Sequence, residues 1–313
     1  MRGTVAPARS HAASHGIAAL PDRAVAAVFG PRPIARLACV RILAPLAILG
    51  FMASRVHHAD DWLSSAGFRV PALADDWRQP VSLPGIPVWA AWSVCVALVI
   101  SGLATSLGLV TRWASGVFAA LLAYVALADR LAAFTVSKLA PVIALVLCLS
   151  PSAARYSVDA WRRHRRDPAG PRPELVSGGC VSFFQVFLPV FYLSSGLAKA
   201  TGDWLSERHV LWTHLHDSYQ TAVSWFLANH LPAWGWTAIQ GAVLAFECGA
   251  PLWFAIRPVR PFALVFGVGM HLTIGLMFGP VIWFSLLMIS LLVASYAPER
   301  WLVRALHLGR PTS

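Results

Sequence analysis

The chain alternates between long apolar segments and short polar connections over most of its length. Each apolar segment is close to the ~20 residues that an α-helix needs to cross ~30 Å of hydrocarbon. The segments are residues 34–54, 87–108, 112–129, 131–150, 179–199, 233–256, 261–279 and 280–297. The last two meet at Gly279–Pro280, which predicts a turn or a kink. The pattern predicts an all-α polytopic integral membrane protein, with about eight transmembrane helices in one bundle.

The polar connections alternate in charge. Arginines gather in the N-terminal tail, in every second connection after it and at the C-terminus, and the opposite connections are balanced or acidic. Because Lys and Arg are retained on the cytoplasmic side, this alternation predicts cytoplasmic N- and C-termini in a plasma (inner) membrane. We expect a flexible cytoplasmic tail at 1–33, one transmembrane domain at 34–300 and a short cytoplasmic tail at 301–313.

Composition supports a lipid bilayer as the main partner. Hydrophobic residues make up 57% of the chain, charged residues only 12%, and the mean hydropathy is +0.62, whereas soluble domains are about a quarter charged. The net charge of +11 is divided among separate connections, so a nucleic-acid partner is not expected. The five cysteines lie in or beside apolar segments without metal-binding or redox spacing, as expected of small buried side chains.

The fifth apolar segment carries a polar stripe. Gln185, Tyr192, Ser195 and Lys199 fall at i, i+7, i+10 and i+14, within about 80° of arc on one helix face. Pro189 has no N–H to donate to the Gln185 carbonyl, which leaves that acceptor free. The stripe predicts a lined polar cavity. The alternative is that Lys199 only extends to the interface as an anchor at the helix end.

Two later segments also carry polar residues: Gln240 and Glu247 in the sixth, and His271 in the seventh. Each could make a structural bond between helices, but ionisable groups inside a membrane are costly and commonly mark functional sites. A Lys, a Glu and a His on three successive helices together predict one buried pocket. The catalytic candidates are Lys199 and His271, and the substrate-binding candidates are Gln185, Tyr192, Ser195, Gln240 and Glu247.

Two connections on the predicted outer side are rich in His and acidic residues. They read HHADD at 57–61 and ERHVLWTHLHD at 207–217. Neither has the ligand spacing of a zinc site, so we expect interfacial loops and no metal. The chain also lacks the sequence motifs of P-loop, dinucleotide-binding, serine hydrolase and zinc protease sites.

The segment RYSVDAWRRHRRDP…SFFQVFLPVFYLSSGLAKATGDW resembles the HTTM family, the membrane domain shared with vitamin K-dependent gamma-carboxylase. In that family a Ser-(Val/Leu)-Asp element precedes a basic loop, and the next span carries Gln, Tyr, Gly and Lys before a Trp. The matching positions are Ser157, Asp159, Gln185, Tyr192, Gly196, Lys199 and Trp204, with Arg41, the Gly108–Arg112 turn and His271 as further matches.

The resemblance implies that Lys199 is a buried base acting on reduced vitamin K or another quinol, as in a carbon–carbon lyase that also epoxidises the quinol. An amine in an apolar site can lose its proton, whereas arginine does not deprotonate in proteins. Two departures limit what is implied. Thr135 and Val136 stand where the carboxylase has an Asn-His pair, and the chain ends shortly after the eighth segment, where the carboxylase continues into a lumenal region. We therefore expect chemistry on a lipid-soluble quinol rather than carboxylation of glutamate.

Two other classes of function compete with the enzyme. One is a non-catalytic membrane partner for the maturation or export of a peptide, a role associated with bacterial relatives of this domain. The other is a small transporter, which is disfavoured because the sequence shows no internal repeat and no paired broken helices.

Overall fold

The computed structural model describes residues 25–67, 83–128, 134–207, 209–216 and 220–307. It confirms an all-α membrane protein. Within the described residues, seven helices are long and apolar enough to cross a membrane. They are α2 (Ile34–Val56), α4 (Val88–Leu107), α5 (Thr111–Ala128), α8 (Gly179–Ala200), α11 (Ala233–Ala255), α12 (Arg260–Met277), and α13 (Ile282–Tyr296) with the turn η2 (Gly279–Val281) before it.

The remaining predicted segment corresponds to a shorter helix, α6 (Thr135–Leu149), of 15 residues. At ~1.5 Å per residue it extends about 22 Å, less than the ~30 Å of a hydrocarbon core. The predicted segment began at 131, and residues 129–133 lie outside the described part of the chain. The boundary between the last two predicted segments is a turn, in which Gly279 has a φ of 38°.

Short elements connect the long helices. They are β1 (Pro31–Pro33), α3 (Ala59–Leu63), α7 (Val158–Arg166), β2 (Leu175–Ser177), α9 (Val210–His214), α10 (Ala222–His230) and α14 (Glu299–His307). The end of the predicted N-terminal tail is thus strand β1, which pairs antiparallel with β2. Part of the predicted C-terminal tail belongs to α14, while residues 1–24 and 308–313 lie outside the described ranges.

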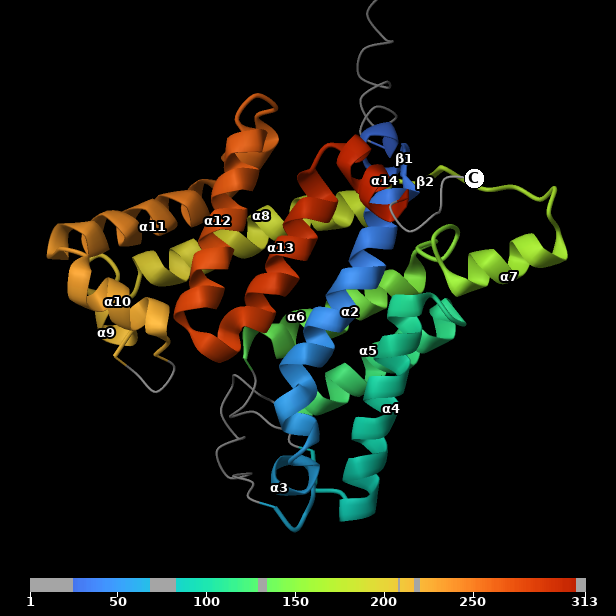
Figure 1. Ribbon diagram of the computed structural model, residues 1–313, viewed down its shortest axis with the longest axis horizontal. Helices are drawn as coiled ribbons and strands as arrows, with labels where there is room; N and C mark the ends of the chain where they lie inside the picture. The colour runs from blue at the N-terminus through green and yellow to red at the C-terminus, as the bar shows by residue number, and fades with distance from the viewer. Residues whose placement is uncertain (1–24, 68–82, 129–133, 208, 217–219, 308–313) are drawn as a thin grey trace, which may run out of the picture.

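Helix α2 occupies the centre of the bundle and packs against α13, α4, α6 and α8. Around it, α5 lies between α4 and α6, α8 lies along α11, and α12 lies along α13. In Figure 1, α8 and α11 slope across the molecule, whereas α2, α12 and α13 run more steeply. Many large apolar side chains point outward, including Ile100 at 62% exposed and Val265 at 72%. Lipid chains would cover these faces, as the sequence predicts.

The ends of several helices are tied together at one end of the bundle. The ribbon of β1 and β2 joins the start of α2 to the start of α8. The guanidinium of Arg36 in α2 donates to the carbonyls of Ala294 and Ser295 at 2.9 Å and of Ala297 at 3.0 Å, at the end of α13. Arg260, at the start of α12, lies over the Tyr296 ring. The basic connections predicted to share one side of the membrane therefore meet at one end of the structure.

A buried arginine joins two of these connections. Arg41 in α2 is fully buried. Its guanidinium donates to the carbonyls of Ser106 at 2.5 Å and Thr105 at 3.3 Å, which belong to the last turn of α4. It also donates to the carbonyls of Ser152, at 3.3 Å, and Tyr156. A cation at a helix C-terminus interacts favourably with the helix dipole, so Arg41 fixes the end of α4 against the chain that follows α6.

The turn between α4 and α5 is shaped around this arginine. Gly108 has a φ of 71°, and a Cβ atom there would lie 2.5 Å from an Arg41 nitrogen, so only glycine fits. The Asp159 carboxylate accepts hydrogen bonds from the Val110 and Thr111 amides at 2.9 and 2.8 Å, at the start of α5. Partial burial acts to raise the pKa of Asp159, but the hydrogen bonds from Thr111 and Val110 outweigh it and the pKa is lowered. The carboxylate therefore stays ionised at neutral pH and caps α5.

The orientation in the membrane can be tested by cysteine accessibility. In a background without the five native cysteines, Ser65→Cys and Ala169→Cys place single thiols at exposed positions on opposite sides of the predicted bilayer. We expect a membrane-impermeant maleimide to label Ser65→Cys in intact cells and Ala169→Cys only after permeabilisation. Labelling of both positions from the same side would contradict the predicted topology.

Candidate functional site

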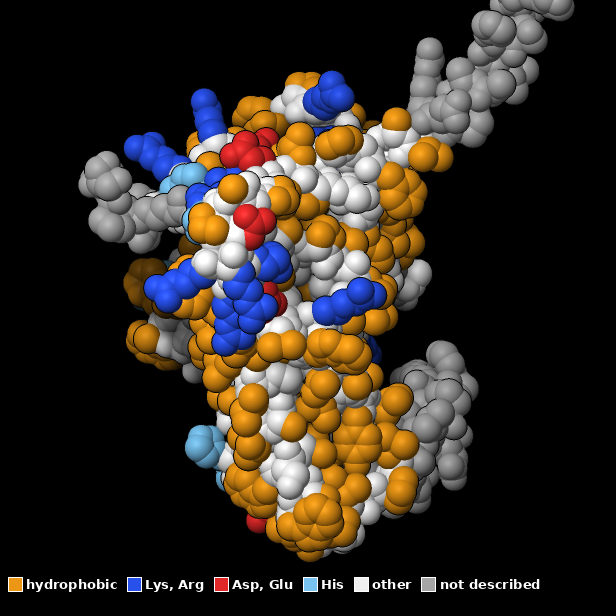
Figure 2. All heavy atoms as spheres, turned by 90° about the vertical axis from the view of Figure 1, so that its right-hand side faces the viewer, with side chains coloured by type: hydrophobic (Ala, Val, Ile, Leu, Met, Phe, Trp, Pro, Cys, Tyr) orange, Lys and Arg blue, Asp and Glu red, His pale blue; other side chains and the backbone are white. Residues whose placement is uncertain are grey.

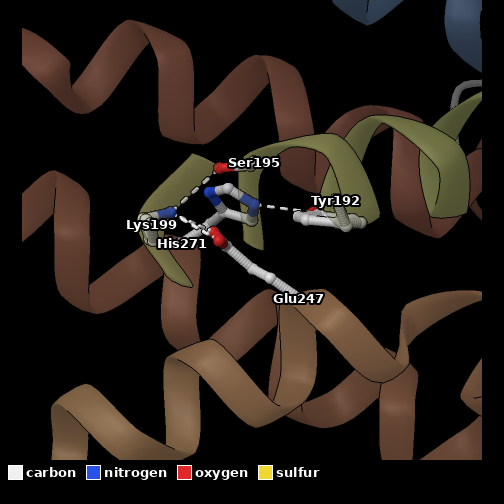
Figure 3. A network of polar contacts seen from close by, with 5 residues as sticks. All are labelled: Tyr192, Ser195, Lys199, Glu247 and His271. Carbon is white, nitrogen blue, oxygen red and sulfur yellow. Dashed lines mark hydrogen bonds and ion pairs between the residues drawn. The ribbon is translucent and has the colours of Figure 1, made fainter. Parts of the chain in front are cut away.

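A lysine–glutamate pair joins α8 to α11. The Lys199 amine donates to both carboxylate oxygens of Glu247, at 2.6 and 2.5 Å, and to the Ser195 hydroxyl at 2.9 Å (Figure 3). The Glu247 side chain is 8% exposed and the Lys199 side chain 24%. The Glu247 side chain is thus enclosed, while part of the Lys199 side chain remains exposed.

Close contact between the two helices makes this pair possible. A Cβ atom at Gly196 would lie 2.8 Å from the backbone nitrogen and from the sulfur of Cys248, and 3.0 Å from the Glu247 carbonyl carbon. Any larger residue would push α8 away from α11. Small residues commonly allow such approach between membrane helices. Gly196 therefore sets the separation across which Lys199 meets Glu247.

The loop after α8 covers the amine. The Trp204 ring centroid lies 5.2 Å from the Lys199 nitrogen, as in a cation–π contact. Gln240 of α11 holds this loop, because its side-chain nitrogen donates to the carbonyls of Trp204 at 2.6 Å and Glu207 at 2.8 Å. Gln240 lies two helical turns before Glu247 on the same helix. It acts on the pair through Trp204 rather than by direct contact.

A second polar contact lies next to the pair. The Tyr192 hydroxyl and His271 Nε2 are 2.7 Å apart, and both residues are 2% exposed. Aromatic rings enclose them: Phe246 meets Tyr192 edge to face at 5.3 Å, and Phe284 meets His271 at 5.5 Å. In Figure 3 the imidazole is seen between Tyr192 and the Lys199 amine. Its Nδ1 atom is buried and has no hydrogen-bond partner among the described residues.

Gln185 lies away from this site. Its side-chain nitrogen donates to the Ser295 carbonyl at 2.8 Å, at the far end of α13. Its own carbonyl, which Pro189 leaves free, accepts a hydrogen bond from the Tyr296 hydroxyl at 2.5 Å. Gln185 and Lys199 share a face of α8, but 14 residues separate them, or about 21 Å along the helix axis. Of the seven predicted site residues, five lie together: the pair itself, Ser195, Tyr192 and His271. Gln240 supports them, and Gln185 joins α8 to α13.

Sequence reasoning did not single out the aromatic walls of this site. Phe246 and Phe284 lie in apolar segments, where nothing distinguishes a ring that faces a pocket from one that faces lipid. The position of Phe246 directly before Glu247 was the one available indication.

His58, His214 and His216, which belong to the two His-rich connections, make local polar contacts in the described residues. His58 lies 3.1 Å from Asp61, and both are exposed. His214 and His216 each contact a carbonyl of the preceding helical turn, at 2.7 and 2.8 Å. Asp217 lies outside the described residues. Among the residues that are described, no three His, Cys, Asp or Glu side chains lie close enough to hold a metal ion together.

Comparison with known proteins gives one match. No curated protein and no solved structure shows significant similarity to the chain. The sequence profile of the HTTM domain matches residues 29–301, which include every helix of the bundle from α2 to α13 and the whole candidate site. The HTTM domain is a membrane domain of the vitamin K-dependent carboxylase family. The chain therefore belongs to the HTTM domain family.

Proposed function

We propose that this protein is an integral membrane enzyme in which Lys199 removes a proton from a lipid-soluble quinol. The observation that carries the proposal is the contact between the amine of Lys199, a partly exposed side chain, and the enclosed carboxylate of Glu247, at 2.5 and 2.6 Å. An amine held only as an interfacial anchor would point its charge to water, and it would not need a buried acid on the next long helix.

The pair provides a way to make the amine basic. When the shared proton moves from Lys199 to Glu247, the amine becomes neutral and the carboxyl becomes uncharged, while the total charge of the pair stays the same. Apolar surroundings favour this neutral arrangement because buried charges lose hydration. Lys199 then accepts the proton of a substrate hydroxyl. The ammonium that forms is stabilised by the negative oxygen left on the substrate and by the Ser195 hydroxyl, 2.9 Å away.

The neighbouring groups suit a flat substrate with oxygen atoms at its edge. Phe246 and Phe284 border the site with aromatic rings, and His271 Nδ1 is a buried polar atom without a partner in the described residues. Tyr192 fixes the imidazole through Nε2. His271 would therefore hold a substrate oxygen while Lys199 takes its proton. In the predicted orientation this chemistry occurs at the outer side of a plasma (inner) membrane.

The test is formation of quinone epoxide. We expect the purified protein to convert reduced naphthoquinone and oxygen into quinone epoxide, measured by chromatography with mass spectrometry. The reaction should not depend on added metal, and carboxylation of a glutamyl peptide should be weak or absent. The control is the Lys199→Ala protein, which should form none above background.

The opposite result would support the competing function. If no quinone gives epoxide and a second protein copurifies tightly, the chain is a non-catalytic partner in peptide maturation or export. Identification of that protein and of any copurified quinone by mass spectrometry would decide between the two.

A further inference from the structure

A cleft of about 830 Å³ lies at the opposite end of the bundle from Lys199. It is bounded by the start of α5, the turn after α6, helix α7 and the loop that follows α7. This volume is within the range of sites that hold small organic ligands. None of the seven predicted site residues lines it, so it is separate from the site of the proposed enzyme.

The cleft carries an excess of positive charge. Its lining holds five arginines and two aspartates, a difference of three positive charges: Arg112, Arg155, Arg163, Arg166 and Arg172 against Asp159 and Asp167. The Asp159 carboxylate is already bound to the amides that begin α5. In Figure 2, basic side chains gather over the upper part of this face, above a mainly hydrophobic lower part.

Two of the five guanidinium groups have no partner in the described residues. Arg155 pairs with Glu174 at 2.8 Å, Arg163 donates to backbone carbonyls, and Arg172 contacts His164. The side chains of Arg112 and Arg166 make no such contact within the described part of the chain. Guanidinium groups bind phosphate oxygens with paired hydrogen bonds, so these two arginines are available to an anion.

The cleft lies at the level expected for lipid headgroups. Trp113 follows Arg112 at the start of α5 and is 77% exposed, and Trp161 of α7 is 53% exposed. Exposed Trp residues favour the interface between hydrocarbon and water. Arg165 lies over the Trp161 ring at 4.4 Å, which places a further charge at the same height. The apolar helices α4 and α5 extend from this level into the predicted bilayer.

We propose that this cleft binds the phosphate of an anionic phospholipid from the cytoplasmic leaflet, with Arg112 and Arg166 as the residues that contact it. Basic pockets between transmembrane helices on the cytoplasmic side are typical sites for anionic headgroups. Bound lipid would join α5 to α7, which are otherwise connected through Asp159.

The experiment measures dissociation constants for the purified full chain by microscale thermophoresis. The probes are dioctanoyl phosphatidylglycerol, dioctanoyl phosphatidylcholine and glycerol phosphate. We expect at least tenfold tighter binding of phosphatidylglycerol than of the other two. Arg112→Gln with Arg166→Gln should weaken phosphatidylglycerol binding by roughly 10- to 30-fold, and the corresponding lysine pair should restore much of it.

The matched control is Arg257→Gln with Arg300→Gln, which removes two exposed charges from the same predicted side of the membrane but outside the cleft. We expect it to bind phosphatidylglycerol within twofold of the unmodified protein. Equal weakening by both pairs would overturn the proposal in favour of a general surface potential. Equal affinity for glycerol phosphate would overturn the lipid source, and equal affinity for phosphatidylcholine would overturn the need for a net negative headgroup. Unchanged melting temperatures of the glutamine variants verify that they are folded.

Discussion

We expect the Lys199→Arg protein to form quinone epoxide at least about a hundredfold more slowly than the unmodified protein, because a positioned base typically contributes 10²–10⁴-fold to a rate. Arginine keeps the positive charge and can still contact Glu247, but it cannot become a neutral base. The measurement is the initial rate of epoxide formation at saturating reduced naphthoquinone, in detergent micelles of fixed composition.

The matched control is Lys138→Arg, the same substitution at the only other lysine of the chain, which is exposed on α6. It should keep full activity. Activity of the Lys199→Ala protein should also return in part when a small primary amine is added, since the missing group is then supplied from solution. Full activity of Lys199→Arg would reject a role for Lys199 as a base and leave it a structural partner of Glu247.

The second large effect concerns stability. We expect Arg41→Leu to lower the free energy of unfolding by roughly 3 kcal/mol or more. Leucine removes the donor for four carbonyls, of which those of Thr105 and Ser106 end α4. The Thr105 carbonyl would keep the hydrogen bond from the Gly108 amide at 3.1 Å, but the carbonyls of Ser106, Ser152 and Tyr156 would lose this donor. Each buried unsatisfied group costs about 1–3 kcal/mol. Unfolding of the purified protein by denaturant, in one fixed detergent, measures the effect.

The control for this prediction is Arg257→Leu, which removes an exposed arginine from the connection between α11 and α12. A surface change of this kind should alter stability by no more than about 0.5 kcal/mol. If Arg41→Leu is equally mild, water or a neighbouring side chain must satisfy the four carbonyls, and Arg41 would not be the residue that holds α4, α6 and α7 together.

The membrane spans could be predicted because a bilayer fixes the length and polarity of any helix that crosses it. The neighbours of each helix could not. Every span carries apolar residues on all sides, so nothing in the sequence of α2 distinguishes its contacts with α13 from its contacts with α4. The polar residues that decide this packing, Arg36 and Arg41, bind mainly backbone carbonyls, which every residue offers.

The candidate site was predictable along each helix but not across helices. Ser195 and Lys199 are one turn apart, and the structure joins them as their spacing predicts. Gln185 satisfies the same angular pattern and still lies about 21 Å from Lys199 along the helix axis. Angular position shows which residues share a helix face, but it does not show how far apart they lie along the helix. The pairing of Lys199 with Glu247 depends on the approach permitted by Gly196, and the contacts of a glycine cannot be deduced from its own segment.

The ribbon of β1 and β2 has a consequence for how the protein is made. Arg32 pairs with Val176, which the ribosome adds 144 positions later. At about 5–20 residues per second, the partner of strand β1 is synthesised roughly 7–30 s after β1 itself. Helix α2 lacks a partner for longer, because α13, against which it packs, follows every other long helix of the described residues. The face of α2 that binds α13 must therefore stay uncovered while the helices between them are synthesised, and closure of the bundle is a late step of its biogenesis.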